Sequence, residues 1–192
     1  MKKLEYPLHE LFTPPFRLAD LEKMSKKEAR AAFDWFVAES PKRIALLSDA
    51  VKRDTGIVLD YSEDSLVPLW EWAVPYFTRR NSPPCGITLE ETRMKPAASN
   101  EGLHIVGLCL TIDIGYYLAE VIMRLRSGVQ WRLWDRKSYP QNEAILTGTR
   151  WPTAPRYIVE NRALDVLEGK VDRHMLLDAC RKTLASIDAP GE

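Results

Sequence analysis

The stretch that decides the fold runs from Gly102 to Arg126 and reads GLHIVGLCLTIDIGYYLAEVIMRLR. Its apolar residues continue for about seven helical turns, so they predict a long central helix over about residues 103–126. At 100° per residue, the polar residues that interrupt the run fall within about 60° of one another on this helix. The sequence therefore predicts one polar stripe on an otherwise apolar helix, made of Asp113, Tyr117, Glu120 and Arg124.

This polar stripe has a structural and a functional interpretation. In the structural one, it is the wet edge of the helix, where Glu120 and Arg124 form an i,i+4 ion pair. In the functional one, all four residues line the carboxylate cleft of a small enzyme and are its candidate catalytic residues. About 10.5 Å of helical rise separates Asp113 from Glu120, which is too far for a shared proton or metal ion unless both side chains lean inward.

Insertion of the Gly102–Arg126 run into a membrane is less favourable than burial in a protein. Asp113 lies near its midpoint and would cost about 2.5–3.5 kcal/mol on insertion scales. The N-terminus begins with lysines but shows no apolar run of the length that an export signal needs. The 3 cysteines are widely spaced and favour neither a disulfide framework nor a zinc site. We therefore expect a cytoplasmic protein with buried thiols and no membrane partner.

Charge is balanced overall but uneven along the chain. With 27 basic and 27 acidic residues, the formal net charge is zero, so no global field attracts nucleic acid or anionic lipid. Residues 121–156 nevertheless hold seven basic side chains against two acids, and residues 85–120 hold five acids against two basic residues. Basic and aromatic residues are mixed in the first of these segments, and such mixtures can hold phosphates and stack bases. The candidate binding residues there are Arg126, Trp131, Arg132, Trp134 and Arg136.

Other signals predict shorter elements around the central helix. Ser25 and Glu28 match a capping box, and Ser40 followed by Pro41 matches a second helix start. Runs of β-favouring residues follow the central helix and predict short strands. The predicted helices span about residues 26–39, 41–55, 62–77, 162–168 and 172–187, and the predicted strands span 129–134, 144–147 and 157–159.

The predicted fold class is α+β and mainly α: a helical domain around the long central helix, with a small antiparallel β-hairpin or three-stranded sheet at about residues 129–159. A length of 192 residues suits a single domain. Residues 1–17 contain three prolines and predict an extended arm, while residues 188–192 predict a frayed tail. Residues 78–101 predict a long irregular loop, and loops of this length are often functional.

Three segments carry a resemblance to other proteins. They are Ser65–Trp72 (SLVPLWEW), Asp113–Glu120 (DIGYYLAE) and Trp131–Gly148. Over about residues 60–150 the chain resembles a family of small bacterial proteins to which no activity is assigned. The resemblance implies a bacterial, cytoplasmic protein and transfers no catalytic residue.

These features favour a non-enzymatic protein-binding factor of the immunity or adaptor type. The motifs HExxH, CxxC, GxGxxG and GxSxG are absent from the sequence, so we expect no metal and no cofactor. The contact surface would combine Glu90 and Glu91 of the loop with the binding residues of the basic segment. One alternative is a small enzyme whose site joins Glu90 or Glu91 to the polar stripe. Another is a nucleic-acid-binding module that uses Trp131–Lys137.

Overall fold

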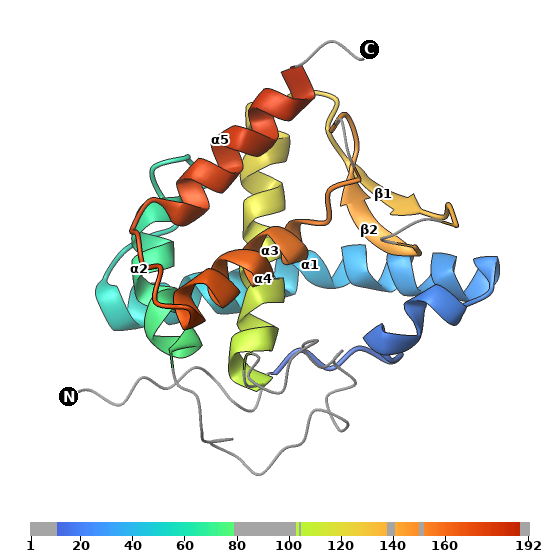
Figure 1. Cartoon of the computed structure of the whole chain (residues 1–192), viewed down its shortest axis with the longest axis horizontal. Coiled ribbons are helices and arrows are strands. Elements are labelled where there is room, and N and C mark those ends of the chain that lie inside the picture. Colours follow the sequence, from blue (N-terminus) through green and yellow to red (C-terminus); the bar gives the residue numbers. More distant parts are fainter. Residues whose placement is uncertain (1–10, 79–102, 104, 138–140, 150–151, 189–192) are drawn as a thin grey trace.

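The computed structural model describes residues 11–78, 103, 105–137, 141–149 and 152–188 (Figure 1). This part of the chain is mainly helical, with one small two-stranded antiparallel sheet, so the predicted α+β, mainly α class is confirmed. In chain order the elements are the 3-10 helix η2 (Leu18–Lys23), α1 (Lys26–Thr55), α2 (Leu66–Phe77), α3 (Ile105–Leu125), β1 (Trp131–Trp134), β2 (Glu143–Leu146), α4 (Pro155–Leu167) and α5 (Met175–Asp188).

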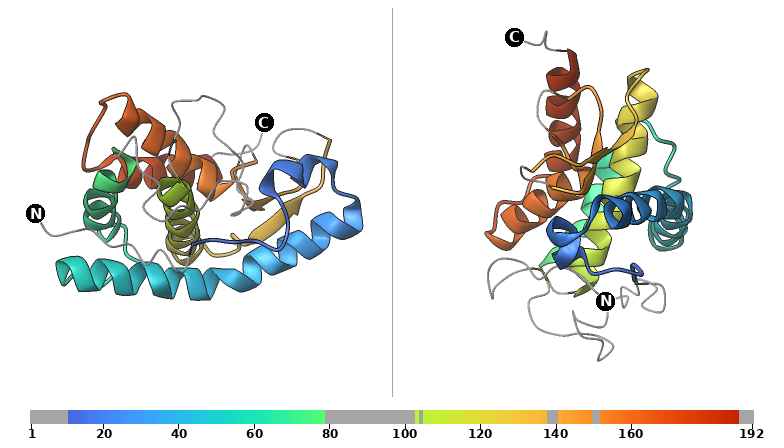
Figure 2. Two further views of the ribbon diagram at one scale, coloured as in Figure 1. Left: turned by 90° about the horizontal axis from the view of Figure 1, so that it is seen from below. Right: turned by 90° about the vertical axis from the view of Figure 1, so that its right-hand side faces the viewer.

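Helix α3 is the centre of the molecule, as the sequence predicts. Every residue from Ile105 to Ala119 is buried, and Val121 and Ile122 extend the buried length. Figure 2 shows α3 end-on, with α1 on one side and α4 and α5 on the opposite side. By length and composition α3 could also cross a membrane, but 94% of its most apolar window is buried inside the protein. The helix thus supplies the core against which the other helices pack.

Helix α1 is one helix of 30 residues, so the prediction of two helices separated at Ser40 was wrong. Its start is as predicted, because Ser25 and Glu28 form a complete capping box. Pro41 has no N–H to donate to the preceding turn, which weakens a helix locally. The apolar face of α1 continues across Pro41, with Phe36 before it and Ile44 after it, and both side chains are buried in the core. This packing keeps the two halves in one helix. Figure 2 shows that α1 bends near its middle.

The sheet is a hairpin of β1 and β2, with Trp131 opposite Leu146 and Trp134 opposite Glu143. The predicted third strand at residues 157–159 was wrong, because these residues lie in α4. Pro155 occupies the first turn of α4, where a missing N–H costs nothing, and it starts the helix earlier than the apolar spacing suggested. Next to the hairpin, only an isolated bridge between Leu146 and Thr153 extends the ladder within the described residues.

Part of the predicted N-terminal arm is described, and it is packed into the core. Residues 11–17 form neither helix nor strand, as expected, but Leu11 and Phe12 are buried. The Phe12 ring meets Trp35 of α1 edge-on at 5.6 Å between centroids. The Cys109 thiol of α3 lies 3.9 Å from the Phe12 carbonyl oxygen. The first ten residues, the loop at 79–102 and the tail at 189–192 lie outside the described residues.

Gly115 of α3 allows the closest helix contact in the core, and its replacement tests the packing. A Cβ atom at Gly115 would lie 2.9 Å from both the backbone nitrogen and the Cα of Arg156, so α4 would have to move. We expect Gly115→Ala to lower the free energy of unfolding by about 1–3 kcal/mol in urea denaturation. Gly107→Ala is the matched control, because its Cβ would meet side chains at 3.5 Å or more. That variant should gain up to about 1 kcal/mol from helix propensity, and equal losses in both would contradict the packing explanation.

Candidate functional site

The four residues of the predicted polar stripe differ in burial: Asp113 and Tyr117 are buried, whereas Glu120 and Arg124 reach solvent. Asp113 is fully buried and pairs with Arg43 of α1, whose side chain is only 3% exposed. The pairing is bidentate: Nε of Arg43 lies 2.7 Å from Oδ1 of Asp113, and Nη2 lies 2.6 Å from Oδ2. This geometry is the strongest that a guanidinium and a carboxylate can adopt. Asp113 therefore joins two core helices and does not face solvent, so the prediction of a wet stripe was wrong here.

Tyr117 is also buried, and it connects α3 to the loop that precedes α2. Its hydroxyl accepts a hydrogen bond from the Tyr61 backbone N–H at 2.8 Å and shares another with the Ser65 hydroxyl at 2.7 Å. The Tyr61 ring stacks on the Tyr117 ring at 5.1 Å, with Tyr61 itself in the left-handed region at φ 64°. Burial raises the pKa of Tyr117. The phenol thus fixes a loop conformation.

The remaining two members of the stripe lie at the solvent-facing end of α3. Glu120 and Arg124 form the predicted i,i+4 ion pair, with 3.8 Å between Oε2 and Nε and side chains 31% and 54% exposed. The Arg124 guanidinium also stacks over the Tyr61 ring at 3.5 Å. Asp113, Tyr117 and this exposed pair consequently do not line one cleft.

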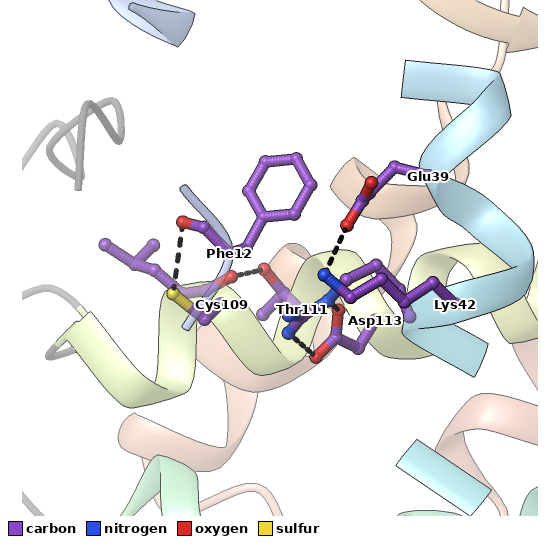
Figure 3. A network of polar contacts seen from close by, with 8 residues as sticks. Phe12, Glu39, Lys42, Cys109, Thr111 and Asp113 are labelled. Carbon is purple, nitrogen blue, oxygen red and sulfur yellow. Dashed lines mark hydrogen bonds and ion pairs between the residues drawn. The ribbon is translucent and has the colours of Figure 1, made fainter. Parts of the chain in front are cut away.

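A cavity with charged residues in its wall lies elsewhere, between the N-terminal segment and α1. Its volume is about 320 Å³, close to the lower end of the range for small-molecule sites. Arg43 forms part of its wall and pairs with the buried Asp113 of α3, and Figure 3 shows Asp113 near Glu39 and Lys42 of the same wall. The wall is made of Leu11, Phe12, Thr13, Trp35, Glu39, Lys42 and Arg43.

None of the residues of this cavity was among the candidates chosen from the sequence. One signal was available, because Arg43 lies seven residues after Phe36 and seven before Ala50. A helix places all three on one face, and the outer two are apolar, so a basic residue between them requires a buried acid as partner. The contribution of Phe12 could not be found this way, because residues 11–17 carry no periodicity.

A second buried ion pair supports the hairpin. Nε of Arg156 donates to Oε2 of Glu143 at 3.1 Å, and Nη2 of Arg156 donates to Oε1 of the same carboxylate. The Tyr157 hydroxyl completes the cluster at 2.8 Å from Oε1 of Glu143. Burial alone would lower the pKa of Arg156, but the charge of Glu143, its hydrogen bond and the nearby Tyr157 and Glu160 together outweigh burial and raise the pKa. The cluster therefore fastens β2 to α4 through a buried guanidinium and carboxylate pair.

The binding residues predicted on the hairpin divide into core and surface. Trp131 packs edge-on against Phe36 at 5.9 Å and contributes to the core. Trp134 is half-buried, with the exposed Arg136 guanidinium 4.9 Å from its ring centroid. Arg132 is exposed. Arg126 is half-buried and donates to the Leu125 carbonyl at 3.1 Å. Glu90 and Glu91 lie outside the described residues.

The titratable groups offer little metal chemistry. Among the described residues, no group of three or more His, Cys, Asp or Glu side chains could hold a metal ion. Cys109 and Cys180 are buried thiols, as predicted, and burial raises the pKa of Cys180 to about 12.

No family model, curated protein or solved structure matches this chain. The resemblance to small bacterial proteins over about residues 60–150 therefore stays a prediction.

The buried pair of Arg43 and Asp113 yields a stability prediction. Asp113→Ala would leave the Arg43 charge buried without its carboxylate, so we expect a loss of about 3–5 kcal/mol in urea denaturation. The double variant Arg43→Leu/Asp113→Leu should recover most of that loss, because no charge then stays buried. Glu120→Ala, at the exposed pair, should cost less than about 1 kcal/mol. Equal losses in Asp113→Ala and Glu120→Ala would contradict this assignment.

Tyr116 yields a prediction about alkaline pH. Burial, and then the negative charges of Asp113 and Glu39, raise its pKa well above the ordinary value of 10.0. The unfolded chain therefore loses the phenol proton first, so the stability contributed by Tyr116 is full below pH 10 and declines as pH rises towards the folded pKa. Tyr116→Phe removes this titration and the 2.8 Å hydrogen bond to the Phe36 carbonyl.

We therefore expect Tyr116→Phe to be less stable than the wild type by about 1 kcal/mol at about pH 7, from the lost hydrogen bond. This difference should shrink at about pH 11. Urea denaturation of both proteins at the two pH values measures the change. A difference that stays constant would show that Tyr116 does not titrate in the unfolding equilibrium.

Proposed function

We propose that this protein is a non-enzymatic binding factor that recognises an acidic surface of a partner protein. The proposed contact surface is the hairpin face, which we define as Arg132, Trp134, Arg136 and Lys137. The observation that carries the proposal is the Arg136 guanidinium stacked at 4.9 Å on the half-buried Trp134, with Arg132 on the same side of β1. Tryptophan and arginine are the residue types most enriched at the energetic centres of protein interfaces.

The charges of the hairpin face are available to a partner. Arg132, Arg136 and Lys137 are exposed, and none of the ion pairs within the described residues involves them. The nearby acid Glu143 is occupied by Arg156 in the buried cluster. An approaching carboxylate would therefore meet guanidinium groups without first displacing an internal partner, which favours fast association.

The hairpin face is also held in a fixed position before binding. The Asn142 side-chain amide donates to the Leu21 carbonyl at 2.7 Å and to the Met24 carbonyl at 3.3 Å, so the turn is tied to η2. The Asn142 backbone N–H donates to the Trp134 carbonyl at 2.6 Å. A surface that is ordered in advance loses less conformational entropy when it binds.

Catalysis by the polar stripe has less support than binding. Asp113 and Tyr117 are used in hydrogen bonds that join core elements, and only Glu120 and Arg124 meet solvent. A nucleic-acid partner is also less favoured, because a net charge of zero gives no general attraction to phosphates. We propose that the protein itself is of the immunity or adaptor class. A bacterial origin and a cytoplasmic location belong to the same proposal.

The test compares binding to an acidic peptide with binding to an oligonucleotide. Fluorescence anisotropy with a labelled oligoglutamate peptide should show salt-sensitive binding by the wild type. Arg132→Glu/Arg136→Glu should weaken it by about tenfold or more. Lys52→Glu/Lys182→Glu is the matched control, because it reverses two exposed charges on α1 and α5, outside the hairpin face.

Two outcomes would count against the proposal. Equal weakening in both double variants would show that net charge alone controls binding. Tighter binding of a single-stranded oligonucleotide than of the peptide would favour the nucleic-acid alternative.

A further inference from the structure

The cavity between the N-terminal segment and α1 has balanced charges. Arg43 is already neutralised by both carboxylate oxygens of Asp113. The other two charged residues of the wall are Glu39 and Lys42, one of each sign. A ligand with a net charge would therefore be repelled by either Glu39 or Lys42. A ligand that carries both a positive and a negative group could pair with both residues.

Glu39 and Lys42 already form an ion pair, but a weak one. Nζ of Lys42 lies 3.3 Å from Oε1 of Glu39, and Figure 3 shows the two groups turned towards each other. The side chains are 62% exposed for Lys42 and 24% exposed for Glu39. Exposed i,i+3 pairs contribute little to stability, so either partner can exchange the other for a ligand group at low cost.

The rest of the wall holds the apolar side chains of Leu11, Phe12 and Trp35 together with Thr13. Phe12 is buried, and Trp35 is half-buried with its ring held edge-on by Phe12 at 5.6 Å and by Phe16 at 5.5 Å. Rings fixed in this way pack well against another flat ring. Trp35 also precedes Glu39 by one helical turn, so the indole and the carboxylate lie on the same face of α1. An ammonium group bound to Glu39 would consequently lie beside an aromatic ring, which adds attraction.

We propose that this cavity binds a small zwitterion with an aromatic side chain, of the α-amino acid class. The ammonium group of the ligand pairs with Glu39, its carboxylate pairs with Lys42, and its ring packs against the half-buried Trp35. The Arg43 and Asp113 pair behind the wall keeps α1 and α3 in register and leaves the wall without excess charge. The cavity shares no residue with the hairpin face, so this inference does not depend on the proposed protein partner.

A series of three ligands with the same phenyl side chain tests the proposal by isothermal titration calorimetry. L-phenylalanine carries both charges, phenethylamine lacks the carboxylate, and 3-phenylpropanoate lacks the ammonium. L-phenylalanine should bind to the wild type, and each truncated ligand should bind about tenfold more weakly because one charged hydrogen bond is lost. Binding by neither L-phenylalanine nor L-tryptophan would overturn the proposal.

Two variants assign the charged groups of the ligand to their partners. Glu39→Gln should weaken L-phenylalanine by about tenfold and leave the affinity for 3-phenylpropanoate equal or higher. Lys42→Met should do the reverse, weakening L-phenylalanine while sparing phenethylamine. Lys52→Met is the control, since Lys52 is an exposed lysine of the same helix outside the cavity.

Neither Glu39 nor Lys42 is fully buried, so thermal unfolding should show that the variants stay folded. Unchanged affinity of L-phenylalanine in both variants would refute the cavity as the binding site. Stronger binding of phenethylamine or of 3-phenylpropanoate than of L-phenylalanine by the wild type would refute the zwitterion.

Discussion

The buried pair of Arg43 and Asp113 is the interaction on which the arrangement of this protein depends. An ion leaves water at a high cost, which only close, multiply bonded contact with an opposite charge can offset. Arg43 and Asp113 meet that condition through two hydrogen bonds of 2.7 and 2.6 Å, and they lie 70 residues apart in the chain. The pair therefore accepts one relative position of α1 and α3, whereas apolar contacts alone would accept several. The cavity wall and the packing of Phe12 follow from that position.

A similar device recurs where the hairpin meets the helices. Arg156 and Glu143 join α4 to β2, and Gly115 lets α3 approach the backbone of α4 at the same residue, Arg156. One residue of α4 thus takes part in a close helix contact and in a charged cluster. This combination places a two-stranded hairpin, which would be marginal alone, on a rigid support.

Much of the fold could be predicted from the sequence because it depends on periodic patterns. The Gly102–Arg126 run predicted α3, and the β-favouring residues at 129–134 and 144–147 predicted the hairpin of β1 and β2. The two errors have different origins, one in tertiary packing and one in a local helix start. Pro41 looked like a helix start, but core packing carries α1 through it, and residues 157–159 looked like a strand, but Pro155 starts α4 before them.

The candidate site was harder to predict for a related reason. Helical spacing correctly grouped Glu120 with Arg124, yet it cannot report that Asp113 is covered by a residue from a distant helix. The cavity depends on Phe12, which lies in a segment without periodicity, and on one face of α1. On the hairpin, strand alternation places Trp131 and Trp134 on opposite faces, but only the contact between Trp131 and Phe36 shows which of the two is inward.

The position of Pro41 has a geometric consequence for the cavity. Trp35 and Glu39 precede the proline, and Lys42 and Arg43 follow it. Both halves of the bent helix α1 therefore contribute to the cavity wall. The backbone bond that proline cannot make is missing at this point. The distance between these two pairs of wall residues therefore depends on the curvature of α1. A small change of that curvature would widen or narrow the cavity while Arg43 stays paired with Asp113.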